Sequence, residues 1–132
     1  MNAAPAQVRL LLVEDEPELA ALIQDGLRSA GYRTVAAARV ADALRLLESE
    51  AFDGAVLDIN LGEELVFPVA DRLAERGIPF LFASGGTAAI PAEYRTRPFI
   101  AKPYPLPQLV AVLRAMMGDR RGPPVPSAGF WA

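Results

Sequence analysis

The sequence predicts an α/β fold in which five parallel strands form a doubly wound sheet with helices on both faces. Short apolar runs alternate along the chain with stretches whose apolar residues recur at the helical period, as in repeated βα units. Two of the runs, Gly54–Leu57 and Pro79–Ala83, are apolar almost throughout, which indicates central strands covered on both faces. The chain has 132 residues, 52% of them hydrophobic, which suits one domain with a substantial core.

The predicted strands share short length and a high content of branched or aromatic residues, and turn-forming or polar residues bound them. Because parallel neighbours need crossover connections, each strand should be followed by a helical segment. The five predicted strands are Val8–Val13, Thr34–Ala37, Gly54–Leu57, Pro79–Ala83 and Phe99–Ala101.

Prolines help to fix where the predicted helices begin. The first helix begins at Pro17, because proline is favoured in a first turn. Pro68 is tolerated only in the first turn of the third helix, and Pro105 and Pro107 confine the last helix to a start near Leu106. The predicted apolar stripes consist of Leu19, Leu22, Ile23 and Leu27 in the first helix, Val40, Leu44 and Leu47 in the second, Val66, Val69, Ala70 and Leu73 in the third, and Leu106, Leu109, Val110, Leu113 and Met117 in the last.

Both ends of the chain fall outside this pattern. Residues 1–7 read as an N-terminal tail, and residues 118–132 hold three prolines and three glycines without periodicity. Such a composition predicts a flexible C-terminal tail after a core at 8–117, with no output domain. The pair Phe130-Trp131 is the one feature of this tail that could dock on a partner or on the parent domain.

Composition excludes several classes of function. The net charge of -3 and the lack of a Lys/Arg run argue against nucleic acid or a membrane surface as the main partner. The chain has no cysteine and no histidine, which excludes disulfides, thiol catalysis, zinc sites and histidine acid/base chemistry. Any metal must therefore be a hard, oxygen-bound ion. No leader-like segment or membrane-spanning apolar run is present, which predicts a cytoplasmic protein.

Polar side chains follow four of the predicted strands. Glu14 and Asp15 come after the first strand, Asp58 after the third, Ser84 after the fourth and Lys102 after the fifth. In open α/β sheets the ligand site lies at the carboxyl ends of the strands, so all five should share one crevice. Three clustered carboxylates repel one another unless a cation is held between them, and Mg²⁺ prefers such oxygen ligands.

This set of residues resembles that of the receiver domain of two-component response regulators, over residues 8–117. The resemblance implies a flavodoxin-like (βα)5 sheet with strand order 2-1-3-4-5. It also implies that a sensor histidine kinase or a histidine phosphotransferase phosphorylates Asp58. In such domains Mg²⁺ is bound by the acidic groups, here Glu14, Asp15 and Asp58, and by a backbone carbonyl, here that of Asn60. The hydroxyl of Ser84 and the ammonium of Lys102 then contact the phosphoryl group.

The same resemblance implies a role in signalling. The protein would pass its signal by phosphorylation-dependent contact with an unknown downstream protein, or serve as a phosphate sink. It would catalyse its own phosphorylation and dephosphorylation without being a dedicated enzyme. The run Pro79-Phe80-Leu81-Phe82-Ala83-Ser84-Gly85 is similar to the motif of single-domain FAT GUY regulators, with Ser in place of Thr. That subgroup implies a kinase of the HWE or HisKA2 type.

Several features depart from the usual receiver pattern. Only 18 positions separate Ser84 from Lys102, with Pro91 between them, so the fourth helix should be short or disordered. Gly62 stands where receivers often carry proline, which predicts a reshaped loop whose acidic residues, Glu63 and Glu64, face water. Phe99, three residues before Lys102, stands where many receivers carry a switching aromatic.

The segment Gly85–Arg97 is predicted to be the part that moves on phosphorylation. Two glycines and a central proline leave it little helix and few buried contacts. On an ordered segment Ile90 and Tyr94, four residues apart, would pack on the sheet as one helical turn.

Three other functions could be considered for the acidic site. A phosphatase or mutase of the haloacid-dehalogenase type needs a second aspartate two residues after the nucleophile, where this chain has Asn60. A flavodoxin-like FMN binder needs a phosphate loop after the first strand, and Glu14-Asp15-Glu16 would repel a phosphate. A pseudo-receiver that binds partners without being phosphorylated stays open as the alternative.

Overall fold

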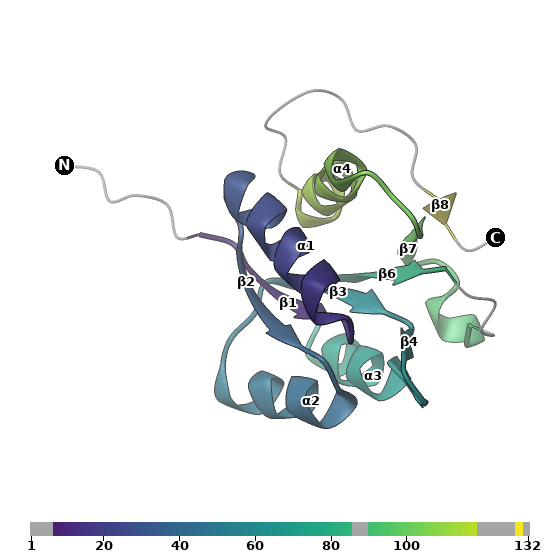
Figure 1. The fold of residues 1–132 in the computed structure, drawn as a ribbon. Helices are drawn as coiled ribbons and strands as arrows, with labels where there is room; N and C mark the ends of the chain where they lie inside the picture. The colour runs from purple at the N-terminus through teal and green to yellow at the C-terminus, as the bar shows by residue number, and fades with distance from the viewer. Residues whose placement is uncertain (1–6, 86–89, 119–128, 131–132) are drawn as a thin grey trace.

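The computed structural model describes residues 7–85, 90–118 and 129–130. Its centre is a parallel sheet of five strands in the order β2-β1-β3-β6-β7, with a short antiparallel strand, β8, beside β7 (Figure 1). The strands are β1 (Arg9–Val13), β2 (Arg33–Ala37), β3 (Gly54–Asp58), β6 (Phe80–Ser84), β7 (Pro98–Ala101) and β8 (Gly129–Phe130). The predicted fold class and the order 2-1-3-4-5 are confirmed, with each strand boundary within one residue of the prediction.

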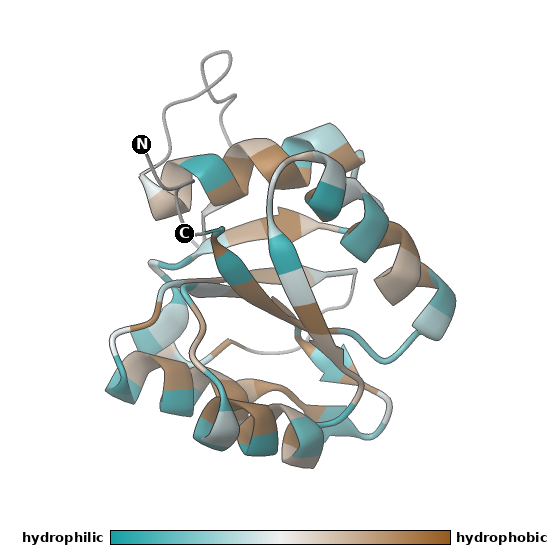
Figure 2. Ribbon diagram, turned by 90° about the vertical axis from the view of Figure 1, so that its left-hand side faces the viewer, coloured by the Kyte–Doolittle hydropathy of each residue, from teal (hydrophilic) through white to brown (hydrophobic). Residues whose placement is uncertain are grey.

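Two helices cover each face of the sheet (Figure 1). The pair α1 (Pro17–Ser29) and α4 (Leu106–Met117) lies on one face, and the pair α2 (Val40–Ser49) and α3 (Phe67–Glu75) lies on the other. Alternate residues of β1 divide between the two cores, with Leu10 and Leu12 under α1 and α4, and Leu11 and Val13 over α2 and α3. The strands are accordingly mostly brown in Figure 2, whereas the helices alternate brown and teal.

The helix starts agree with the proline positions. Pro17 begins α1, Pro68 lies in the first turn of α3, and α4 begins at Leu106. Gly118 ends α4 in the left-handed conformation, with a φ of 73°, which a glycine adopts without steric cost. One predicted stripe residue is wrong: Leu22 is 64% exposed, because Ala20, Ile23 and Leu27 form the buried face of α1.

The connection between β6 and β7 contains one short 3₁₀ helix, η1 (Ala92–Tyr94). Residues 90–97 form no α-helix, which confirms the predicted reduction of the fourth helix in the part that the structure describes; residues 86–89 lie outside it. Tyr94 is buried and packs against the sheet from this 3₁₀ turn.

The loop after β3 is a small hairpin. Its strands β4 (Asn60–Leu61) and β5 (Glu64–Leu65) pair antiparallel, and Gly62 turns between them with a φ of 64°. Only glycine adopts that conformation readily, which is why proline could not replace it here. Glu63 and Glu64 are exposed, as predicted.

The C-terminal residues are described only in part. Within the predicted flexible tail, Gly129 and Phe130 pair antiparallel with Phe99 and Pro98 at the edge of β7. Residues 119–128 and 131–132, Trp131 among them, lie outside the described residues, as do residues 1–6. In the described ranges, every helix is too short or too polar to cross a bilayer.

Candidate functional site

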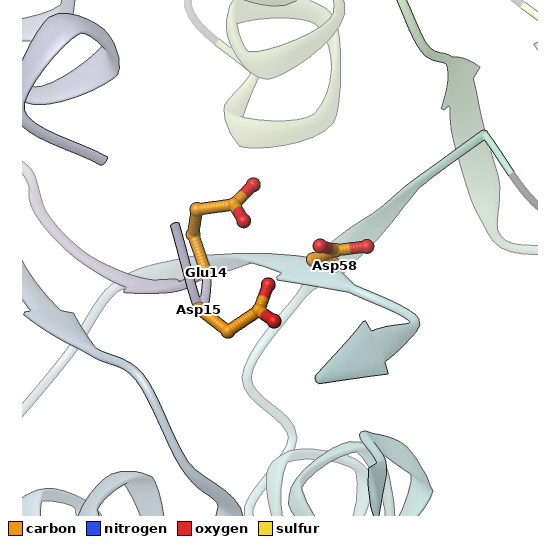
Figure 3. Close-up of side chains that lie close together, drawn as sticks. All are labelled: Glu14, Asp15 and Asp58. Atoms are coloured by element: carbon orange, nitrogen blue, oxygen red, sulfur yellow. The ribbon is translucent and has the colours of Figure 1, made fainter. Parts of the chain in front are cut away.

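Three carboxylates converge at the carboxyl edge of the sheet. Glu14 and Asp15 follow β1, Asp58 ends β3, and their side chains point toward one another (Figure 3). One oxygen from each lies within 4.8 Å of the others. Glu14 and Asp58 are buried, at 3% and 8% exposure, whereas Asp15 is more exposed. The structure thus brings together the three carboxylates that the sequence placed at one edge of the sheet.

Parallel pairing places these residues side by side. Val13 of β1 is in register with Leu57 of β3, so the next residue of each strand, Glu14 or Asp58, emerges at the same edge. The N–H of Glu14 donates to the carbonyl of Ala37 at 3.0 Å, which continues the pairing of β1 with β2. The backbone pairing of the apolar strands therefore sets the positions of Glu14 and Asp58 without any contact between their side chains.

Lys102 lies between two of the carboxylates. Its Nζ donates to Glu14 Oε1 at 2.6 Å and to Asp58 Oδ2 at 3.1 Å. The backbone holds it there, because the N–H of Lys102 donates to the carbonyl of Ser84 at 3.0 Å. Burial disfavours the charged ammonium, but the hydrogen bonds to Glu14 and Asp58 outweigh it and raise the pKa of Lys102. The lysine stays charged at the centre of the site.

Asp58 is the carboxylate with the most perturbed protonation. Burial raises the pKa of Asp58 to about 6, the hydrogen bonds and charge of Lys102 oppose that rise, and the charge of Glu14 adds to it. The N–H of Asn60 also donates to Asp58 Oδ1, at 3.4 Å. At neutral pH Asp58 is thus an ionised group held in an environment that disfavours its charge, as is common at reactive sites.

The other predicted site residues take different places. Ser84 is buried at the end of β6, one residue past the partner of Asp58 in the sheet, so it lies at the same edge. Asn60 begins β4, next to Asp58, and the role of its carbonyl stays a prediction. Phe99 is half-buried on β7, in register with Phe82, and a switching role for it is likewise untested.

Tyr104 is a neighbour of the site that the sequence reasoning missed. Burial raises its pKa to about 12; the charge of Lys102 opposes this, and the charges of Glu14 and Asp58 favour it. The phenol therefore stays neutral near these charges. No motif marks it, because a tyrosine three residues after a strand end is an ordinary loop residue.

The donor set suits a hard divalent cation. Mg²⁺ binds through one or two carboxylates and keeps several waters. Three carboxylates converge here, and Asp15 is less buried than the other two. No histidine or cysteine competes for a softer metal. Glu63 and Glu64 are not part of the cluster.

Known proteins match this chain over most of its length. Residues 10–114 match the family model described as the response regulator receiver domain. The transcriptional regulatory protein PrrA of Mycobacterium tuberculosis is 29% identical over 130 residues, which cover 92% of this chain and 54% of PrrA. TcrA of the same species is 31% identical over 122 residues, 88% of this chain and 47% of TcrA. The chain thus spans about half the length of these curated relatives.

Solved structures agree in fold. The solution structure of SdrG from Sphingomonas melonis Fr1 has a TM-score of 0.74 and 38% identity, and the match covers 86% of this chain and 99% of that one. A response regulator receiver protein from Sinorhizobium medicae WSM419 has a TM-score of 0.74 and 26% identity, covering 89% of this chain and 100% of that one. Since the family model alone matches most of the 132 residues, the chain belongs to the receiver domains of two-component response regulators.

Proposed function

We propose that this receiver accepts a phosphoryl group on Asp58 from a phosphohistidine of a sensor histidine kinase or a histidine phosphotransferase. The observation that carries the proposal is the placement of Asp58 in reach of both a lysine and two further carboxylates at the sheet edge. The phosphorylated chain then signals by protein contact, or serves as a phosphate sink. A kinase of the HWE or HisKA2 type is proposed from the Pro79–Gly85 motif.

The proposed reaction needs no separate base. A lone pair on a carboxylate oxygen of Asp58 forms the P–O bond while the P–N bond to the donor histidine breaks. The leaving imidazole nitrogen keeps the electron pair of the broken P–N bond. We expect Lys102 to neutralise charge on the transferred oxygens, and its hydrogen bond to Asp58 supports this role. Ser84 at the end of β6 is proposed to donate to another phosphoryl oxygen.

Glu14, Asp15 and Asp58 are the residues that would hold Mg²⁺, with the carbonyl of Asn60 as a further ligand. When bound, the ion supplies positive charge that balances the carboxylates and the incoming phosphoryl oxygens. The pairing of β1 with β3 holds Glu14 and Asp58 at the same edge of the sheet, which supports this set of ligands.

The metal site predicts a stability response. Millimolar Mg²⁺ should raise the melting temperature by about 3 to 6 °C, because a ligand that binds only the folded state stabilises it. Asp15→Asn should blunt the rise. Glu63→Gln, which removes an exposed acid outside the cluster, should leave it intact. Thermal melts at constant ionic strength measure this, and equal curves with and without Mg²⁺ would contradict the metal site.

The acceptor assignment predicts a labelling result. Incubation with a phosphorylated histidine kinase and Mg²⁺ should label the protein with an acid-stable, alkali-labile acyl phosphate. Asp58→Ala should abolish the label, and Lys102→Ala should weaken transfer without removing the acceptor. Asp53→Asn, which alters the residue just before β3, should label normally. A label that persists in Asp58→Ala would show that the acceptor is another residue, and no label with any donor would favour the phosphorylation-independent binding module.

A further inference from the structure

The ring of Tyr94, in the connection between β6 and β7, contacts both α3 and β6. Its side chain is 4% exposed and its ring stacks on Phe67 at 6.3 Å between centroids, with 12° between the planes. The edges of Phe80 and Phe82 complete the contact, at 5.7 and 5.9 Å. Phe67 begins α3, whereas Phe80 and Phe82 belong to β6. One ring therefore packs simultaneously on the helix after Asp58 and on the strand that carries Ser84.

A hydrogen bond fixes the orientation of this ring. The hydroxyl of Tyr94 donates to Asp71 Oδ1 on α3. Burial and this hydrogen bond raise the pKa of Tyr94, so the hydroxyl remains a donor throughout the physiological range. Nearby, the guanidinium of Arg97 lies 4.3 Å from the centroid of the Phe80 ring, which anchors the end of the same segment. Tyr94 and Arg97 together attach residues 90–97 to the domain.

The aromatic residues that contact Tyr94 are close in sequence to residues of the acidic site. Going back along the chain from Phe67, the β4–β5 hairpin reaches Asp58, and the N–H of Val66 closes this hairpin by donating to the carbonyl of Ile59 at 3.0 Å. Going forward from Phe82, Ser84 is two residues away. Packed rings therefore connect the Tyr94 side chain both to the helix that follows the hairpin and to the strand that carries Ser84, and such packing leaves little room for independent movement.

We propose that Tyr94 is a positioning residue that couples the β4–β5 hairpin to residues 90–97, so that both respond as one unit to a phosphoryl group on Asp58. This inference rests on the proposed function. It assigns the coupling to a tyrosine outside the strand, eight residues before Lys102, and to its hydrogen bond with Asp71. The two connections that border the site then report its state jointly.

Amide hydrogen exchange with beryllofluoride and Mg²⁺, a phosphoryl mimic, tests the coupling. In the wild type, exchange at residues 60–66 and at residues 90–97 should both change by about fivefold or more. In Tyr94→Leu the change at residues 60–66 should remain, while the change at residues 90–97 should fall below about twofold. An equal response of both segments in this variant would overturn the proposal.

Two milder variants keep the test decisive should Tyr94→Leu fail to fold. Tyr94→Phe and Asp71→Ala remove the same hydrogen bond from opposite sides, so each should reduce the response at residues 90–97, and the double variant should add nothing further. Additive losses would overturn the shared role of the bond. Tyr32→Phe, a buried tyrosine in the core on the other face of the sheet, is the matched control and should keep both responses.

The outcomes separate this inference from the proposed function. A wild type that shows no change at either segment, and an Asp58→Asn variant that behaves identically, would count against phosphoryl acceptance at Asp58 and against the inference with it. A wild type that responds at residues 60–66 alone would leave phosphoryl acceptance in place and overturn only the coupling.

Discussion

Lys102→Ala is expected to lower the free energy of unfolding by about 2 to 3 kcal/mol at pH 8 without Mg²⁺, because it leaves buried carboxylates without their counter-charge. The lysine side chain is 19% exposed and bonds Glu14 and Asp58, whose side chains are 2% and 10% exposed. Urea unfolding of both proteins measures the difference. Excess Mg²⁺ should narrow it, since the cation takes over part of the neutralisation.

A matched control distinguishes this effect from the loss of any cation. Arg28 forms an ion pair with Asp25 in which both side chains are more than 70% exposed. Arg28→Ala should therefore change the free energy of unfolding by less than about 0.5 kcal/mol. Equal urea midpoints for Lys102→Ala and the wild type would show that hydration, rather than the lysine, stabilises the charged carboxylates.

Asp58→Asn is expected to stabilise the protein without Mg²⁺, and only above a defined pH. The folded state raises the pKa of Asp58 from 3.8 to about 6, so it holds a proton that the unfolded chain has already released between these values. The wild type therefore loses stability as pH rises through this window. The gain of the variant should be near zero below pH 4 and reach about 1 to 2 kcal/mol above pH 6.

Urea midpoints from pH 4 to pH 8 test this, with and without Mg²⁺. Adding Mg²⁺ should reverse the order at pH 8, because the wild type gains a ligand that the amide of Asn binds poorly. Asp53→Asn, which alters an exposed aspartate just before β3 and outside the carboxylate cluster, should not show the reversal on addition of Mg²⁺. A stability difference that stays constant across the pH range would contradict the raised pKa.

The sheet and its acidic edge were predictable because both depend on patterns along the chain. Leu10–Val13 and Phe80–Ala83 are continuous apolar runs, and the residue after a parallel strand emerges at the ligand edge whatever the side chains around it. Glu14, Asp58 and Lys102 could thus be grouped from their positions alone. Which oxygens Lys102 contacts could not, because that depends on side-chain conformation and on the distances across the sheet.

The features that sequence patterns left out depend on contacts between distant residues. Leu22 fits a helical stripe, yet only the sheet decides which face of α1 is buried, and that face is formed by Ala20, Ile23 and Leu27. The hairpin at Gly62 is too short to show an alternating pattern. The bond from Tyr94 to Asp71 spans 23 residues and follows no periodicity.

The short strand β8 has a consequence for self-association. An outer strand of a sheet offers backbone N–H and C=O groups to strands of other molecules, so open edges promote aggregation. Gly129 and Phe130 occupy part of the edge of β7, and no described residue pairs with the outer side of β2. There the exposed Arg33 places a charge on the edge, which opposes the approach of a second strand. The two edges of the sheet are thus protected by different means, the β7 edge by backbone pairing within the chain and the β2 edge by charge.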